Sequence, residues 1–284
     1  MYKILTKRTL NPTVVQMEIE APLVARKAKA GQFIILRVDE EGERIPLTVA
    51  GTDASRGAVK IIFQVVGATT KKLSFKEAGD CIQDFVGPLG KPTHIDGLRR
   101  VCIVGGGVGC AIALPVAEAL RAAGACVTSI IGFRSRDLLI LEEEFRQASE
   151  RLFVMTDDGS YGEKGNVTAP LKALLEAGGS FDEIITIGPL VMMKFVTLTA
   201  KPYGVPVTAS MNPIMIDGTG MCGGCRLTLA VDGKRITKFA CVDGPDFNAY
   251  EIDFDEAMSR GRMYGDFERH AYENTCNLFG KGEA

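Results

Sequence analysis

The chain reads Val101-Cys-Ile-Val-Gly105-Gly-Gly-Val-Gly109, and residues 111–123 after it have the composition of a helix. An unbroken apolar run of this length predicts a buried strand. The glycines that follow permit a tight turn into the helix. Because strand, glycine turn and helix in this order form half of a parallel βαβ unit, the segment predicts an α/β domain.

Further strands on the C-terminal side extend this pattern. Residues 127–133, 152–156 and 183–188 are runs rich in apolar and β-branched residues, and stretches of helical composition alternate with them. This alternation is typical of a doubly wound parallel sheet. We therefore predict a nucleotide-binding α/β domain over residues 99–212.

The N-terminal part differs, because short strands follow one another there and only one short helix is expected. The strand-like runs lie at 13–20, 32–38, 45–50 and 59–66, and turn-prone Gly, Pro and Asp separate them. Their spacing is typical of a small antiparallel barrel. The predicted fold class is thus a β barrel over residues 1–98 followed by an α/β domain.

The glycine turn is a candidate anion site. The backbone N–H groups of Gly106, Gly107 and Gly109 can point at a pyrophosphate, and the dipole of the following helix adds to the attraction. The turn departs from the Gly-x-Gly-x-x-Gly fingerprint, since Cys110 stands where the third glycine is expected. Close packing of strand on helix explains the same glycines, so the motif alone leaves both interpretations open.

A second motif contains Cys222, Cys225 and Cys241. The pair Gly223-Gly224 lets the first two sulfurs turn toward one point. Alternating apolar runs flank Asp232-Gly233, a strong short-range signal for a hairpin, which would return Cys241 to the first two cysteines. The pattern predicts a thiolate-held metal centre within residues 213–250.

The fourth ligand is not a nearby cysteine. Plant-like 2Fe–2S clusters have a cysteine five positions before the close pair, and this chain has Asp217 there. We expect three thiolates and the Asp217 carboxylate to hold a 2Fe–2S cluster. Two alternatives remain: a structural zinc, although zinc ribbons normally have a second close pair, and an Asp217 that only caps a turn while an outlying cysteine binds.

The composition excludes several partners. The chain has 284 residues, a net charge of -2 and a pI of about 5.9, so neither nucleic acid nor an anionic membrane is an expected partner. The first residues lack the apolar core of a signal peptide. The longest apolar stretch, 101–117, is interrupted by glycines and fits a strand and helix better than a membrane span. We expect a cytoplasmic protein.

Five motifs occur in an order that resembles the ferredoxin-NADP reductase superfamily: Arg44-Ile-Pro46-Leu47-Thr48, Gly67-Ala-Thr69-Thr70, Gly87-Pro-Leu-Gly90, Gly105–Gly109 and Gly188-Pro189-Leu-Val-Met192. The cysteine segment narrows the match. With it, the chain is similar to the electron-transfer subunits of dihydroorotate dehydrogenase and sulfide dehydrogenase, and most of all to the small subunit of the electron-bifurcating NADH-dependent ferredoxin:NADP+ oxidoreductase.

The resemblance implies an FAD site on the barrel. It assigns Arg44 to the pyrophosphate, Pro46, Leu47 and Thr48 to the isoalloxazine ring, and Gly67, Thr69 and Thr70 to a second phosphate-binding turn. A guanidinium suits phosphate oxygens because it can bind them in a bidentate manner. By its sequence alone, Thr69 equally fits a helix cap.

The resemblance also implies a nicotinamide nucleotide site. Its walls would be formed by Gly106, Gly107, Gly109, Asp157, Gly188, Pro189 and Met192. The resemblance favours NADH. Arg134-Ser-Arg136 after a predicted strand could instead accept the 2'-phosphate of NADPH, or could simply be solvated.

The implied function is electron transfer. NADH would reduce FAD, and electrons would pass through the 2Fe–2S cluster to a larger flavin and iron–sulfur subunit in a heterodimer, as part of a bifurcating oxidoreductase. The alternatives are a sulfide, polysulfide or dihydroorotate dehydrogenase subunit, and a non-redox scaffold that holds zinc. Residues 251–284 are expected to form one or two helices with a disordered end after Leu278. They either pack on the barrel or dock a partner subunit.

Overall fold

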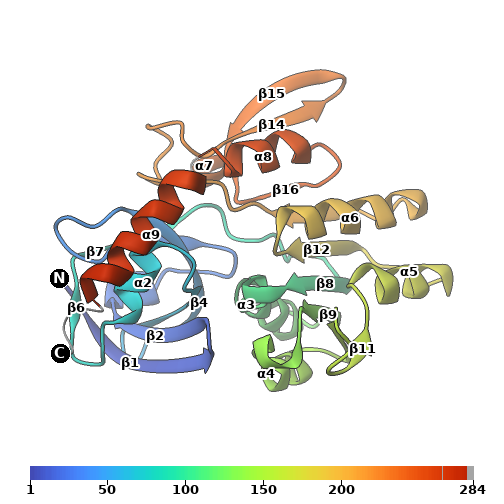
Figure 1. The fold of residues 1–284 in the computed structure, drawn as a ribbon. Coiled ribbons are helices and arrows are strands. Elements are labelled where there is room, and N and C mark those ends of the chain that lie inside the picture. The colour runs from blue at the N-terminus through green and yellow to red at the C-terminus, as the bar shows by residue number, and fades with distance from the viewer. Residues whose placement is uncertain (264, 280–284) are drawn as a thin grey trace.

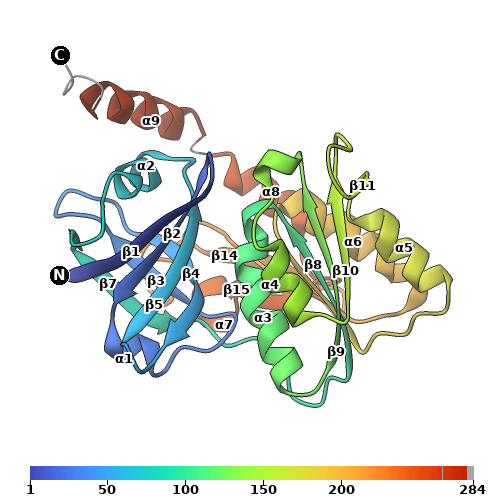
Figure 2. The same cartoon turned by 90° about the horizontal axis from the view of Figure 1, so that it is seen from below.

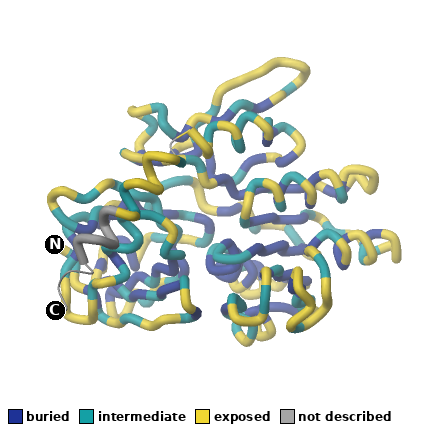
Figure 3. Tube along the Cα trace, in the orientation of Figure 1, coloured by how far each residue is buried: buried dark blue, intermediate teal, exposed yellow. Residues whose placement is uncertain are grey.

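A computed structural model of the chain describes residues 1–263 and 265–279. Within these residues the strands form two seven-stranded sheets and a two-stranded hairpin. The two sheets lie side by side, and the hairpin projects from the junction between them (Figure 1). Most sheet strands are buried, whereas the hairpin and the connecting loops are largely exposed (Figure 3).

The first sheet is the predicted antiparallel barrel. Its strands have the order β6-β1-β2-β5-β4-β3-β7, and neighbours in this order are antiparallel. Alternate residues such as Ile4, Met17 and Ile61 point inward and are fully buried, which is the pattern of strands with one solvated face. The elements are β1 (Tyr2–Asn11), β2 (Val14–Glu20), α1 (Pro22–Ala25), β3 (Phe33–Arg37), β4 (Ile45–Asp53), β5 (Ala58–Gln64), α2 (Ala68–Ser74), β6 (Cys81–Ile82) and β7 (Asp84–Leu89).

The second sheet is the predicted doubly wound sheet. Its strand order is β11-β10-β9-β8-β12-β13-β16, and all pairs are parallel except β13 with β16. The elements are β8 (Arg100–Gly106), α3 (Cys110–Ala122), β9 (Cys126–Phe133), α4 (Glu142–Ala148), β10 (Arg151–Thr156), β11 (Glu163–Lys164), α5 (Thr168–Glu176), β12 (Glu183–Ile187), α6 (Leu190–Ala200), β13 (Val207–Ser210) and β16 (Asp246–Asn248).

The first strand of this domain, β8, explains why helices cover both faces of the sheet. On β8, Val101 and Ile103 pack with α3 and α4, whereas Cys102 and Val104 pack with α5 and α6. Because successive strand residues point to opposite faces, an unbroken apolar strand needs helices on both sides. The strand order reverses between β8 and β12, and this place is the topological switch point of the sheet.

The cysteine segment joins the same sheet. Its hairpin consists of β14 (Arg226–Val231) and β15 (Lys234–Phe239), and Asp232 and Gly233 at the turn have φ of 50° and 74°. Two positive φ angles are the signature of the type I′ turn that the Asp-Gly pair predicts. After α7 (Ala240–Asp243), strand β16 pairs with β13.

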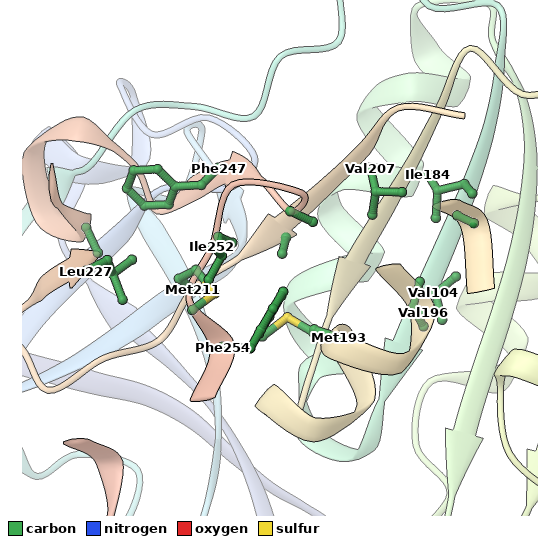
Figure 4. Packing of buried hydrophobic residues seen from close by; sticks show 14 of the residues in the cluster. Val104, Ile184, Met193, Val196, Val207, Met211, Leu227, Phe247, Ile252 and Phe254 are labelled. Atoms are coloured by element: carbon green, nitrogen blue, oxygen red, sulfur yellow. The ribbon is translucent and has the colours of Figure 1, made fainter. Parts of the chain in front are cut away.

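A shared hydrophobic core fixes this attachment. Leu227 and Phe247 of the cysteine segment, and Ile252 just after it, lie in the same buried cluster as Val104 and Val207 of the parallel strands (Figure 4). The predicted segment 213–250 is therefore packed onto the nucleotide-binding domain and is not a separate body.

The C-terminal residues form two helices, as expected. The first, α8 (Phe254–Gly261), begins at Asp253, whose carboxylate accepts the N–H of Glu256, and an ion pair of 2.7 Å joins Asp255 to Lys194 of α6. The second, α9 (Gly265–Phe279), lies against α2 of the barrel (Figure 2). The second helix of the tail thus packs on the barrel, as one expectation had it, whereas the first packs on the nucleotide-binding domain; docking of a partner subunit stays a prediction. The expected disordered end falls mainly on residues outside the described ranges.

In the part of the chain that the structure describes, every helix is too short or too polar to cross a lipid bilayer.

Candidate functional site

The glycine turn at the end of β8 is shaped by its neighbours. A Cβ atom on Gly109 would lie 2.5 Å from the carbonyl oxygen of Ile187, and one on Gly106 would lie 2.3 Å from the sulfur of Met192. Gly107 has a φ of +54° and nothing within 4 Å of such a Cβ. The turn is thus closed toward β12 and open at Gly107, where its backbone can approach a ligand.

Gly188, Pro189 and Met192 follow β12, the neighbour of β8. An added Cβ on Gly188 would lie 3.1 Å from the backbone nitrogen of Gly106. The structure therefore brings these residues next to the glycine turn, as predicted. They meet at the switch point, where the carboxyl ends of the strands of a doubly wound sheet form a ligand crevice.

Asp157 lies on the same edge of the sheet but two strands from β8. Its backbone N–H donates to the carbonyl of Phe133, at 3.0 Å, where β9 ends. In the neighbouring loop, the guanidinium of Arg136 lies over the ring of Tyr161 at 5.6 Å. The residues that are predicted to bind the nucleotide thus lie along one edge of the parallel sheet. The glycines are at the centre of this edge, and Asp157 is to one side.

The residues assigned to the isoalloxazine ring lie on β4. Pro46, Leu47 and Thr48 pair there with β3. The residues of the second turn begin α2, where the Thr70 hydroxyl accepts the N–H groups of Val66 and Gly67 at 3.1 and 3.0 Å. Thr70 therefore caps this helix, which orders the turn whether or not a phosphate binds.

Arg44 connects the barrel motif to the cysteine segment. Its Nε donates to the carbonyl oxygen of Ile216 at 3.0 Å, directly before Asp217. An added Cβ on Gly218 would lie 2.6 Å from Leu89 and 3.0 Å from Ile35, so the backbone of the segment lies directly on β3 and β7. Nothing in the sequence indicates this contact between residues 172 positions apart.

The four predicted metal ligands are gathered but do not form a finished site. The sulfurs of Cys225 and Cys241 are buried and 3.2 Å apart, whereas Cys222 is exposed. The Asp217 carboxylate accepts the N–H groups of Thr219 and Cys222, both at 2.8 Å. Among the described residues, no three His, Cys, Asp or Glu side chains are arranged so that they could hold a metal ion.

The protonation of these groups follows from their surroundings. The backbone N–H of Thr219 contributes most to lowering the pKa of Asp217. Burial, followed by the hydrogen bond with Cys225, raises the pKa of Cys241 to about 12. The free thiol of Cys241 is therefore protonated at neutral pH, and metal binding has to displace its proton.

The donor set fits an iron–sulfur cluster. Thiolates are the ligands that such clusters use, and the adjacent Cys225 and Cys241 sulfurs can bind one centre. The cysteines outside the segment whose side chains are described lie on the barrel or the parallel sheet: Cys81 on β6, Cys102 on β8, Cys110 on α3 and Cys126 on β9. The alternative of an outlying cysteine as fourth ligand gains no support from them.

A surface cavity of about 540 Å³ lies away from this edge. It opens at the amino ends of β12 and β13, and Glu183, Lys201 and Tyr250 are among the residues that line it. None of the residues predicted to bind a cofactor or metal lines this cavity, so it belongs to neither site.

Comparison with known proteins identifies the relatives of the chain. Residues 212–253 match the model of the iron-sulfur cluster binding domain of dihydroorotate dehydrogenase B. The chain is 46% identical over 281 residues to a Thermotoga maritima protein described as a homolog of the electron transfer subunit of dihydroorotate dehydrogenase B (NAD(+)), and the match covers 99% of this chain and 98% of the relative.

Solved structures show the same relationship. The structure of an NADH-dependent reduced ferredoxin-NADP oxidoreductase, studied for flavin-based electron bifurcation, contains a chain that is 44% identical, with a TM-score of 0.90 and coverage of 96% of this chain and 97% of that one. The ferredoxin reductase of carbazole 1,9a-dioxygenase shares the fold at a TM-score of 0.62 and 19% identity, over 72% of this chain and 65% of that one.

Fold and matches together place the chain among the flavin and iron–sulfur oxidoreductases built on the ferredoxin reductase fold. More narrowly, it belongs to the family of dihydroorotate dehydrogenase B electron-transfer subunits and their homologues. The resemblance seen in the sequence motifs is confirmed, and an iron–sulfur cluster is favoured over zinc.

Proposed function

We propose that this chain is the small, electron-transfer subunit of a cytoplasmic electron-bifurcating NADH-dependent ferredoxin:NADP+ oxidoreductase. It oxidises NADH at FAD and passes electrons through a 2Fe–2S cluster to a larger flavin and iron–sulfur subunit. The match to a chain of the bifurcating enzyme over nearly the full length of both chains supports this role. The similarity to the Thermotoga maritima relative, which is described as an electron transfer subunit homolog, supports it as well.

The observation that carries the proposal is the convergence of three candidate sites around β4. On one side, α3 packs against β4, and the turn Gly107–Gly109 approaches β5. On the other side, Arg44 just before β4 donates to the carbonyl of Ile216 in the cysteine segment. A flavin held on β4 would thus lie between a nucleotide and a cluster, which is the order that electron transfer requires.

The chemistry needs such an intermediate carrier. When bound, FAD accepts two electrons from NADH as a hydride and releases them one at a time, which is the unit that an iron–sulfur cluster accepts. The residues of this chain bind and orient the carriers. The open backbone of Gly107 would face the nucleotide phosphates, and Pro46, Leu47 and Thr48 on β4 would support the flavin ring. No side chain has to act as acid or base, so the rate depends on positioning.

We propose NADH as the nucleotide. Arg136 is held over the Tyr161 ring, and its backbone N–H donates to the Ser160 hydroxyl at 2.8 Å. Cation–π contact is attractive without any phosphate, so the arginine has a role in the free protein. A preference for NADPH would indicate instead that this loop accepts a 2'-phosphate.

The experiment is an anaerobic titration of the purified chain with NADH and, separately, with NADPH. The visible spectrum reports flavin reduction, and EPR of the reduced sample reports the cluster. We expect flavin bleaching at stoichiometric NADH and a rhombic one-electron signal. A colourless protein that contains zinc would overturn the proposal in favour of the scaffold alternative.

The net reaction is tested on the complex with the larger subunit. NADH and reduced ferredoxin should together reduce NADP+ to NADPH, and the amounts of NADH and of reduced ferredoxin that are oxidised should stand in a fixed ratio. Turnover with dihydroorotate, sulfide or polysulfide, and none with ferredoxin, would assign the chain to the alternative dehydrogenases.

A further inference from the structure

Three parts of the molecule meet at the side chain of Asp246. Its Oδ2 accepts a hydrogen bond of 2.5 Å from the hydroxyl of Thr93, which lies between the barrel and the parallel sheet. On β16, Asp246 is opposite Ser210, the last residue of β13. Thr93 and Ser210 are only 7% and 8% exposed. The carboxyl therefore lies where the flavin barrel, the nucleotide domain and the cysteine segment join.

Burying this carboxyl at the junction costs free energy of folding. Its other oxygen, Oδ1, is buried, and among the described residues no donor has hydrogen-bonding geometry to it, although the nearby Ser210 hydroxyl lowers the pKa of the carboxyl. A buried polar atom without a partner opposes folding, and a smaller or apolar side chain would avoid that penalty. Stability of the fold does not explain Asp246, and an orphaned buried group of this kind calls for another explanation.

Backbone hydrogen bonds of the two residues just before Asp246 show what this part of the chain anchors. The N–H of Lys91 donates to the carbonyl of Gly244 at 2.6 Å, and the N–H of Met211 donates to the carbonyl of Pro245 at 2.9 Å. Gly244 is the third residue after Cys241. The end of the cysteine segment is thus tied to both domains at one place, and the Thr93–Asp246 bond is the side-chain part of that connection.

We propose that Asp246 and Thr93 are positioning residues for electron transfer: their hydrogen bond fixes the cysteine segment against the flavin barrel and thereby sets the separation of flavin and cluster. The inference rests on the function proposed above. Because Asp246 follows the three cysteines of the segment and makes none of the contacts that shape the glycine turn, we expect its loss to slow transfer from flavin to cluster more than the reaction of NADH with the flavin.

Three variants test the proposal in the cofactor-loaded chain: Asp246→Ala, Asp246→Asn and Thr93→Val. The control is Asp182→Ala. Asp182 also joins the inter-domain segment to the sheet, since it accepts the N–H groups of Arg99 and Arg100 at 2.7 and 2.9 Å, but it precedes β12 and lies at the amino ends of the strands.

Rapid mixing with NADH, followed by freeze-quench EPR, separates flavin reduction from cluster reduction. We expect flavin reduction within twofold of wild type in all variants. Cluster reduction should slow about tenfold in Asp246→Ala and Thr93→Val, because small displacements of reacting groups have large effects on rate. Asp246→Asn should retain most of the rate, since its amide oxygen can still accept the Thr93 bond.

A second readout does not depend on activity. Amide hydrogen exchange across residues 240–250 should rise in Asp246→Ala and Thr93→Val and stay near wild type in Asp246→Asn and Asp182→Ala. If Asp246→Ala fails to fold, the same measurements on Thr93→Val test the proposal.

Four results would overturn the inference: wild-type cluster reduction in Thr93→Val and Asp246→Ala, slowing of flavin reduction by the same factor, equal slowing in Asp182→Ala, or no rescue by Asn. Absence of any NADH-dependent flavin reduction in the wild-type chain would instead refute the proposed function, and the inference with it.

Discussion

The glycine turn and the cysteine segment are the two candidate binding sites attached to the parallel sheet, and the polypeptide completes them to different degrees. At the turn, backbone atoms already touch: a Cβ on Gly109 would lie 2.7 Å from the Cα of Gly188. In the cysteine segment, the sulfurs of Cys225 and Cys241 approach each other, whereas the Cys222 sulfur is exposed and accepts a long bond of 3.5 Å from Gly224.

The difference shows how each kind of site is made. A phosphate site uses backbone N–H groups, whose positions a packed sheet fixes in advance. A cluster site uses thiolate side chains, which repel one another when ionised, so the metal itself completes the arrangement. The nucleotide edge should therefore respond to steric changes, and the cysteine segment to changes in ligand chemistry.

The largest expected effect comes from Cys225→Ser. It should abolish the cluster, since a buried thiolate ligand is lost, while NADH still reduces the flavin. Iron content and EPR measure the loss, and the visible spectrum measures flavin reduction. The matched control is Cys126→Ser, an exposed cysteine on β9, which should keep the cluster. Retention of the full EPR signal in Cys225→Ser would break the comparison.

Among substitutions in the glycine turn, Gly109→Ala should have the largest effect. The new Cβ would lie 2.5 Å from a carbonyl oxygen of the sheet, and neither backbone can move freely. We expect a loss of about 1–3 kcal/mol in stability from overpacking and a fall of roughly 100-fold in NADH-dependent flavin reduction from misplacement of the nucleotide. Thermal unfolding and anaerobic stopped-flow measure the two effects, and a variant with wild-type behaviour in both would contradict the steric account.

Gly107→Ala is the matched comparison within the same turn. The position has open space but a φ of +54°, so the expected cost is about 1–2 kcal/mol of backbone strain. Its Cβ would enter the space proposed for the phosphates, and the KM for NADH should rise while the cluster spectrum stays unchanged. An unchanged KM would remove Gly107 from the nucleotide site.

Asp217 tests the ligand chemistry of the cysteine segment. Because a carboxylate is a harder ligand than a thiolate, Asp217→Cys should keep the cluster and shift its EPR g values. Asp217→Ala should lower iron content. Unchanged spectra in both variants would show that Asp217 serves only as the acceptor for the N–H groups of Thr219 and Cys222.

The smallest expected effect is on the pH dependence of stability. Burial raises the pKa of Asp246 above its ordinary value, and the uncharged hydroxyls of Ser210 and Thr93 oppose that rise. The folded state then holds a proton that the unfolded state has released, so this group lowers stability as pH rises from about 4 through its folded pKa. Asp246→Asn should remove that decline. Thermal unfolding of the wild type and of Asp246→Asn between pH 4 and 8 measures this decline in stability. If stability changed with pH in the same way in both proteins, the prediction would be contradicted.

Local features of the chain were predictable because neighbouring residues determine them. The strand, glycine turn and helix over residues 101–123 correspond to β8, the turn at Gly107–Gly109 and α3. The Asp232-Gly233 hairpin forms with the expected turn type. The order of the motifs also identified the family, and the comparisons confirm it.

The sequence by itself thus determined the fold class, the cysteine and glycine motifs and the family, because periodicity, turn residues and motif spacing act over a few residues. Only the tertiary structure decided what joins the parts: the pairing of β16 with β13, the Arg44–Ile216 bond and the Thr93–Asp246 bond. These contacts span up to 172 positions. They depend on how two sheets and a hairpin pack, and no local pattern encodes that packing.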